Sequence, residues 1–226
     1  MTRFTIATCL LAATALSACA STRDSTIAGM SGYELAGHAL HTGDYATAHV
    51  GFSCIATRGS GYEVAQHNAG LASMGLAQSP GLPAEDAASL EARAVEELTL
   101  AARAGWPASQ AELVQYYAAK GDPDSLNMAG FWLWNYIANN RETALGIRRL
   151  NDAERQRYSE IIGEEIMEAA RQDALEFRMT PLVSRSASPS CAPWFSQGDP
   201  NRTRRRPPQD NTDAGRQQPG QPGYGY

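Results

Sequence analysis

An internal repeat with helical spacing constrains the fold of this 226-residue chain more than any other feature. Apolar and small residues from Ala48 to Gly59 recur in the same order from Ala94 to Gly105, 46 residues later. A looser third copy begins at Gly130, 36 residues after the second. Spacing of i, i+4, i+7 and i+8 places side chains on one face of an α-helix. Periods of about 20–50 residues are typical of stacked helical hairpins, so the pattern predicts an all-α fold.

The segments between these copies also resemble one another, because Gln66 and Gln110 occupy related positions in two of them. Small residues at Gly37 and Gly70 predict close approach between helices. Gly- and Pro-containing breaks separate the periodic stretches. A longer apolar stripe with Asp152 as its N-cap predicts one continuous final helix. The expected helices span 32–41, 45–57, 62–75, 85–104, 108–119, 123–139, 142–149 and 152–178.

A family resemblance is clearest over residues 62–105, where the matching positions are Ala65, Gln66, Gly70, Ala94, Ala101, Ala102 and Gly105. On these residues the chain resembles the Sel1-like repeat family, which is related to tetratricopeptide repeats. The family's Trp-Tyr pair is replaced by Glu97-Leu98 in this copy, and the 76–88 loop is an insertion. The resemblance covers roughly residues 32–140 and implies a helical-hairpin solenoid that binds proteins on its concave face.

The first residues have the build of a bacterial lipoprotein signal. A positive charge at Arg3 precedes a short apolar stretch, and Leu16-Ser17-Ala18 leads directly into Cys19. This resemblance implies cleavage before Cys19, lipidation of its thiol and attachment to a membrane on the periplasmic side of the cell envelope. Ala20 follows the cysteine, and in such lipoproteins a residue other than Asp there favours the outer membrane over the inner. An ordinary cleaved signal with a chance cysteine is the alternative.

Composition divides the chain into five expected segments. The signal peptide and the lipidated tether precede the repeats, and capping helices and a disordered tail rich in Pro, Gly and Arg follow them. Basic residues cluster between Arg202 and Arg206. Such a cluster could contact anionic lipid headgroups or an acidic partner, or its charges could simply keep the tail solvated. The boundaries are 1–18 for the signal, 19–31 for the tether, 32–140 for the solenoid, 141–180 for the caps and 181–226 for the tail.

The four cysteines have different expected fates. Cys9 leaves with the signal and Cys19 carries the lipid, so Cys54 and Cys191 remain. An exported protein meets an oxidising compartment, which favours a Cys54–Cys191 disulfide. Sequence cannot fix the connectivity, and two unrelated thiols are the alternative.

Two surfaces are candidates for binding. Tyr116 and Gln110 lie on the fifth expected helix, where first helices of such pairs line the concave side in the family, and they are the partner-binding candidates. On the sixth expected helix, aromatic residues could form a ligand cradle, and they are Phe131, Trp132, Trp134 and Tyr136. The preferred interpretation is packing, with Trp134 and Ile137 facing the core while Trp132 and Tyr136 fill the next groove or cover the capping helices.

A weaker alternative is a metal site. Glu34, His38 and His41 fall at i, i+4 and i+7 on one helical face, and these residue types ligate zinc. His49, His67 and Cys54 are further donors that stacking could bring near. The spacing lacks the general-base glutamate of a zinc protease motif, and a solvated polar face is the simpler interpretation.

The remaining features argue for a binding role. The net charge of −5 argues against nucleic acid as a partner. No nucleophile elbow, phosphate-binding glycine loop or C-x-x-C motif occurs, so we expect no catalytic site and no cofactor. The sequence therefore predicts an envelope lipoprotein that acts as a protein–protein interaction scaffold for an unidentified partner. The alternatives are a metal-binding or enzymatic envelope protein and a structural lipoprotein that contacts peptidoglycan.

Overall fold

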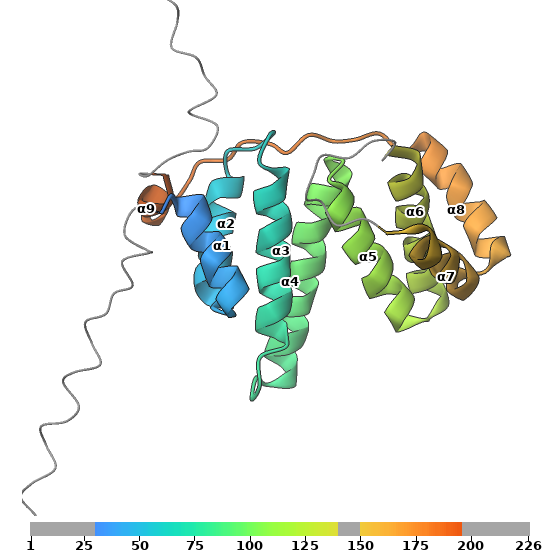
Figure 1. Cartoon of the computed structure of the whole chain (residues 1–226), viewed down its shortest axis with the longest axis horizontal. Helices are drawn as coiled ribbons and strands as arrows, with labels where there is room; N and C mark the ends of the chain where they lie inside the picture. Colours follow the sequence, from blue (N-terminus) through green and yellow to red (C-terminus); the bar gives the residue numbers. More distant parts are fainter. Residues whose placement is uncertain (1–29, 140–149, 196–226) are drawn as a thin grey trace, which may run out of the picture.

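The computed structural model describes residues 30–139 and 150–195, and within these residues it is entirely helical apart from turns and one extended segment. Six long helices follow one another as antiparallel neighbours in a single row (Figure 1). Among the described residues, no helix has both the length and the apolarity that a membrane span requires. The six are α1 (Gly32–Thr42), α2 (Tyr45–Ala56), α3 (Glu63–Ala77), α4 (Ala84–Arg103), α5 (Pro107–Lys120) and α6 (Pro123–Asn139).

Local capping chemistry sets several of these boundaries. Ser31 and Glu34 form a reciprocal capping box at the start of α1, and Gly43 ends the helix in the left-handed conformation with φ +81°. Pro107 occupies the first turn of α5, and Gly121 ends that helix with φ +72°. The expected boundaries of the first six helices agree with the observed ones to within two residues, because each signal acts on its own turn.

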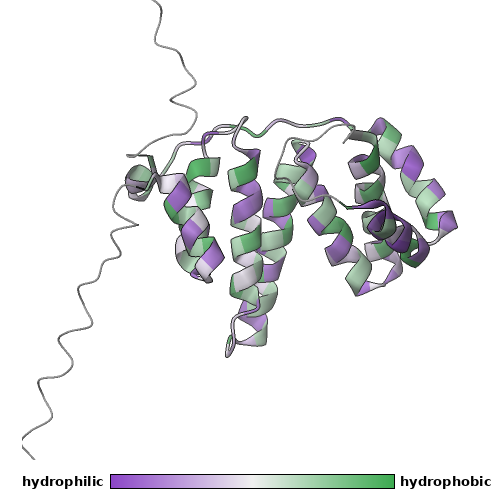
Figure 2. Ribbon diagram, in the orientation of Figure 1, coloured by the Kyte–Doolittle hydropathy of each residue, from purple (hydrophilic) through white to green (hydrophobic). Residues whose placement is uncertain are grey.

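The apolar faces of the helices form two clusters of buried side chains. The first joins α1, α2 and α3 through alanines packed around Phe52, and the second joins α4 to α6 through Leu98, Leu113, Leu133 and their neighbours. Figure 2 shows green and purple faces alternating on the individual helices of the row, as expected for helices that bury one side. At Gly70 an added Cβ would lie 2.8 Å from the Leu98 Cγ atom, so the predicted close approach of helices at Gly70 is confirmed. At Gly37 the prediction is wrong, because nothing lies within 4 Å of that position.

The predicted single helix over 152–178 is wrong. The structure has two helices, α7 (Asp152–Ile162) and α8 (Glu164–Glu176), separated by Gly163 at φ +86°. A glycine with positive φ ends α7, and the turn lets α8 return along α6, where Ala170 packs beside Gly130. Asn151 rather than Asp152 is the N-cap, with Glu154 completing a capping box. The other expected helix, over 142–149, lies outside the described residues.

The C-terminal segment returns across the whole row. Residues 177–188 run from α8 back over one end of the helices to η1 (Pro189–Cys191) and α9 (Ala192–Phe195), which lie beside α1 and α2 (Figure 1). We call residues 177–188 the strap. The Thr180 amide donates to the Arg103 carbonyl at 2.8 Å, and the Arg185 amide donates to the Thr57 carbonyl at 2.8 Å. The predicted disorder of the tail is therefore wrong over residues 181–195, because backbone hydrogen bonds and one disulfide hold this segment. Residues 196–226 lie outside the described part.

Helix α9 covers the exposed side of the first hairpin. A Cβ at Gly51 would lie 2.5 Å from the Trp194 ring, so the indole occupies the space that this glycine leaves open. The Arg58 guanidinium lies 4.7 Å from the Phe195 ring centre and 5.4 Å from that of Tyr62. At the opposite end of the row, α7 and α8 pack against α5 and α6. Both ends of the row are thus covered by segments from the C-terminal part of the chain.

Candidate functional site

Tyr116 lies in a polar cluster that joins α4 to α5. Its hydroxyl donates a 2.6 Å hydrogen bond to the Glu91 carboxylate, and Lys120 Nζ lies 3.2 Å from the same carboxylate. The Lys120 ammonium also sits 4.7 Å from the centre of the Tyr116 ring, within cation–π range. Tyr117 packs edge-on against Tyr116, with ring centres 5.1 Å apart. Tyr116 is half-buried, so one part of the ring is accessible while its hydroxyl is already bonded.

These contacts change the protonation behaviour of all three groups. The hydrogen bond from Tyr116, together with Lys120, lowers the pKa of the Glu91 carboxyl. The Tyr116 hydroxyl and the Glu91 carboxylate raise the pKa of Lys120 to about 12. Partial burial and the bond to Glu91 raise the pKa of the Tyr116 phenol. At neutral pH the cluster therefore holds an ionised carboxylate, an ammonium and a neutral phenol.

Gln110 does not belong to an accessible surface, so its assignment as a partner-binding residue is wrong. Its side chain is 0% exposed, and Nε2 donates to the Ala102 carbonyl at 3.2 Å. Gln66 is placed in the same way, with Nε2 donating to the Glu97 carbonyl at 3.4 Å. Each glutamine near the start of an odd-numbered helix thus bonds the backbone of α4. The repeated glutamine is a packing feature, because a buried amide needs partners and finds them on the neighbouring helix.

A polar network connects α2, α3 and α4 beside the core. His49 Nε2 lies 2.8 Å from the Glu97 carboxylate, and the Ser73 hydroxyl donates to the same carboxylate at 2.7 Å. The Ser53 hydroxyl also meets His49 Nε2, at 3.2 Å. A nucleophilic relay requires serine and carboxylate on opposite ring nitrogens, whereas here both approach the same nitrogen. The network therefore joins three helices and has no relay geometry.

The three metal-site candidates do not converge. The Glu34 carboxylate accepts a 2.7 Å hydrogen bond from the Ser31 amide and serves as the N-terminal cap of α1. His41 is exposed at the other end of the same helix. The further donors are engaged elsewhere, since Cys54 is in a disulfide and His67 Nδ1 lies 2.9 Å from the Ser109 hydroxyl. No group of three His, Cys, Asp or Glu residues suited to a metal ion occurs in the described ranges 30–139 and 150–195.

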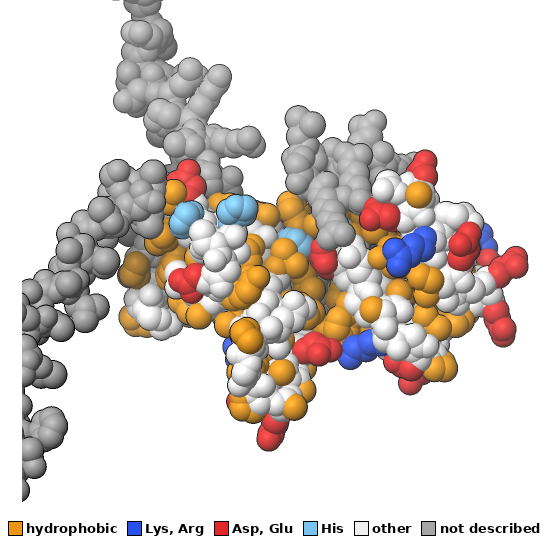
Figure 3. All heavy atoms as spheres, turned by 60° about the horizontal axis from the view of Figure 1, so that its bottom comes forward, with side chains coloured by type: hydrophobic (Ala, Val, Ile, Leu, Met, Phe, Trp, Pro, Cys, Tyr) orange, Lys and Arg blue, Asp and Glu red, His pale blue; other side chains and the backbone are white. Residues whose placement is uncertain are grey.

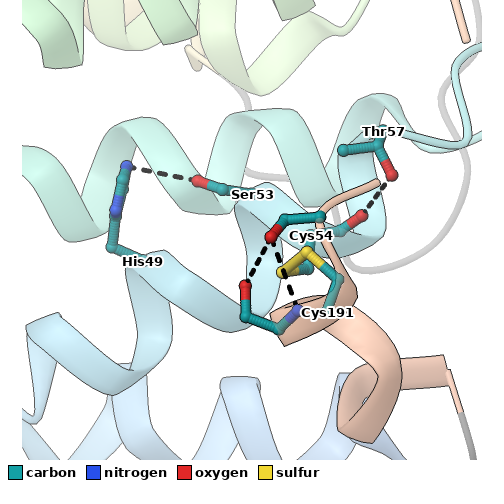
Figure 4. Close-up of a disulfide and its surroundings, with 7 residues drawn as sticks. His49, Ser53, Cys54, Thr57 and Cys191 are labelled. Carbon is teal, nitrogen blue, oxygen red and sulfur yellow. Dashed lines mark hydrogen bonds between the residues drawn. A yellow bond between two sulfur atoms is a disulfide. The ribbon is translucent and has the colours of Figure 1, made fainter. Parts of the chain in front are cut away.

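Cys54 and Cys191 are bonded to each other, which selects the first of the two alternatives left open by the sequence. The S–S distance is 2.03 Å and the Cα atoms are 5.3 Å apart. Figure 4 shows the bond between α2 and the η1 turn. The Cys191 amide donates to the Ser188 carbonyl at 2.9 Å, within its own segment. Both cysteines are buried. The bond fixes the end of the strap to the first helical hairpin.

The aromatic residues of α6 pack, but in a different register from the expected one. Trp132 and Tyr136 are buried in the core, whereas Trp134 lies at the α8 interface and donates from Nε1 to the Met167 carbonyl at 2.7 Å. The fully buried Ala129 and Leu133 take the places of Ala94 and Leu98, an offset of 35 residues rather than 36. The shift by one residue turns α6 so that Trp134 meets the capping helix.

Known proteins give no further guidance. No family model matches the chain, and no curated protein or solved structure matches it. The lipidation candidate Cys19 and the basic cluster 202–206 lie outside the described residues.

The residues that sequence reasoning missed are Arg103 and Arg185, which the strap brings to one cavity. Their only sequence signal was Cys191, because a disulfide to Cys54, one of the two alternatives left open, would bring its segment to α2.

Proposed function

We propose that this chain is a membrane-anchored envelope lipoprotein whose row of hairpins is a Sel1-like α-solenoid that holds a protein partner. The role is binding rather than catalysis. The observation that supports it best is the burial of repeated positions, since Gln66 and Gln110 are both buried, as are Phe52 and Leu98. Stacked hairpins of this kind form extended binding surfaces because each unit packs only on its neighbours.

The shape of the row supports a partner surface between α4 and α5. The α3–α4 hairpin is longer than its neighbours and projects beyond them (Figure 1). Figure 3 shows this projection, and beside it the surface is hollowed, with hydrophobic side chains interspersed among polar and acidic ones. The cluster of Tyr116, Glu91 and Lys120 bridges the two helices that flank the hollow. An aromatic ring with a charged pair beside it is typical of interaction hot spots.

Membrane attachment is the second part of the proposal and depends on Cys19. A diacylated N-terminus would keep the helical row at a membrane surface, where binding is favoured by local concentration without further contacts. The tether over 19–31 supplies the reach. The preferred location is the periplasmic side of the outer membrane.

The partner surface is tested by crosslinking in intact cells that make the protein natively. A photoreactive phenylalanine analogue replaces Tyr116 in one strain and Asp173, an exposed residue of α8, in a control strain. We expect a discrete protein adduct from position 116 and none from position 173. Equal labelling at both positions, or none at either, would refute the α4–α5 surface.

The anchor is tested separately by mass spectrometry of the protein extracted from membranes. We expect the mature chain to begin at Cys19 and to carry the added mass of fatty acyl groups. A Cys19→Ser variant should remain unprocessed or be released from the membrane. Recovery of an unlipidated wild-type N-terminus would contradict the lipoprotein assignment, whatever the crosslinking shows.

A further inference from the structure

A cavity lies where the strap crosses the ends of α2, α3 and α4. Its volume is about 240 Å³, and its lining residues combine apolar side chains with two arginines, a glutamine and a threonine. Leu100 and Val183 are 39% and 76% exposed, which is high for large aliphatic residues. The main lining residues are Ala56, Gln66, Leu100, Arg103, Val183 and Arg185. We call this the strap pocket.

The backbones of the two arginines are held in place, and their head groups have no partner among the residues that the structure describes. The carbonyl of Arg103 accepts the Thr180 amide, and the amide of Arg185 donates to Thr57, so both backbones are fixed. Within residues 30–139 and 150–195, neither guanidinium has an ion-pair or hydrogen-bond partner. The chain carries a net charge of −5, so two unpaired cations at one cavity form a local positive site on an acidic protein. A guanidinium is suited to bind a carboxylate in a planar, two-bond geometry.

The strap also offers unpaired backbone groups at the rim. Between the two anchoring hydrogen bonds, Leu182 and Val183 form no backbone hydrogen bond with any part of the chain that the structure describes. Each such residue has one amide donor and one carbonyl acceptor. An extended segment with free backbone groups can be joined by a second extended chain, while alternate side chains enter pockets.

We propose that the strap pocket binds an extended peptide segment of a partner protein, which places an aliphatic side chain against Leu100 and Val183 and a carboxylate against Arg103 and Arg185. This inference deepens the proposed scaffold function and rests on it for the identity of the partner as a protein. The pocket accepts an acidic-aliphatic pair at alternate positions of the peptide, because those side chains point to the same side of an extended chain.

The test uses the purified chain and two synthetic peptides. The acidic probe is acetyl-Thr-Leu-Thr-Glu-Thr-amide, and the neutral probe has Gln in place of Glu. Binding is followed by backbone amide chemical shifts, which report the site as well as the affinity. We expect the acidic peptide to shift resonances of Leu100 and residues 180–185, and the neutral peptide to bind about tenfold more weakly, as loss of a charged hydrogen bond predicts.

Variants then test whether Arg103 and Arg185 bind the carboxylate of the peptide. Arg103→Gln and Arg185→Gln should each weaken the acidic peptide about tenfold and leave the neutral one unchanged. Arg93→Gln is the matched control, because Arg93 is an exposed residue of the same helix, about 15 Å along its axis from Arg103. Circular dichroism of each variant should match the wild type, since neither guanidinium has an ion-pair or hydrogen-bond partner among the described residues.

Several outcomes would overturn the inference. They are no shift with the acidic peptide up to about 10 mM, equal affinity for the two peptides, or equal loss in the Arg93 control. Hexanoate binding as tightly as the acidic peptide would make the pocket a site for small carboxylates instead of peptides. These measurements need neither lipid nor a native partner, so their failure is separate from failure of the crosslinking and mass-spectrometry experiments.

Discussion

The disulfide between Cys54 and Cys191 is expected to be the largest single stabilising element of this fold. It joins residues 137 positions apart and fixes the strap and α9 to the first hairpin. The perturbation is the double variant Cys54→Ala/Cys191→Ala, which removes both thiols and avoids intermolecular bridges. Both cysteines are buried, and the strap's backbone hydrogen bonds to Arg103 and Thr57 involve neither of them.

The expected magnitude follows from the length of the closed loop. In the chain-entropy model, a cross-link that closes a loop of 137 residues removes denatured-state entropy equivalent to about 5 kcal/mol at 25 °C. For a domain of this size, such a loss lowers the melting temperature by about 10–20 °C. The uncrosslinked denatured chain is also more expanded, so the slope of unfolding free energy against urea concentration should increase.

The assay is urea unfolding at pH 7 and 25 °C, followed by circular dichroism, with and without a thiol reductant. We expect the wild type with reductant to unfold at the same urea concentration as the double variant without it. The reductant should not move the transition of the variant, which serves as its control. Wild type and variant that unfold together under oxidising conditions would refute the argument, because the cross-link would then contribute nothing to stability.

Four further substitutions test the packing. Burial lowers the pKa of His67 from 6.5 to about 4. Between pH 6.5 and pH 4 the unfolded chain therefore binds a proton on this histidine that the folded chain does not bind. The free energy of unfolding should then fall as the pH falls, by about 3 kcal/mol at pH 4. A His67→Asn variant should lose this part of the pH dependence of the urea midpoint. Gly70→Ala should destabilise by about 1–3 kcal/mol, because its Cβ meets Leu98, whereas Gly37→Ala should stabilise by up to about 1 kcal/mol. Gln110→Ala should cost about 2 kcal/mol in thermal unfolding by removing a buried hydrogen bond.

The histidine and glutamine changes each have a control on an exposed position. His41→Asn should leave the pH dependence of stability as it is in the wild type, and Gln172→Ala should leave the melting temperature within about 1 °C. A flat pH profile for the wild type between pH 6.5 and 4 would contradict the buried neutral His67. Equal effects of alanine at positions 37 and 70 would contradict the close packing of α3 on α4.

The helix boundaries were the most predictable part of the fold, because capping acts locally. A proline in the first turn begins α5, and a left-handed glycine ends α1 and α5. Gly163 followed the same rule and was overlooked, since the apolar stripe of the expected 152–178 helix continues in phase across it. Only the contact of α8 with α6 makes the turn there necessary.

The candidate sites were less predictable, because burial depends on the neighbouring helix. Tyr116 and Gln110 lie six positions apart on α5, yet one is half-exposed and the other is fully buried. Glu34 had the residue type and spacing of a metal ligand, but the cap of α1 uses its carboxylate. Sequence spacing assigns residues to a helical face, and it does not say which face the adjacent hairpin covers.

The sequence by itself determined that the described chain is helical, where most helices begin and end, and which apolar positions repeat. These properties arise from interactions within a few turns of the backbone. Only the tertiary structure decided that residues 181–195 return across the row, that the two buried cysteines meet, and that Arg103 and Arg185 share a cavity. Such contacts join residues that are far apart in the chain, and their positions depend on how every intervening helix packs.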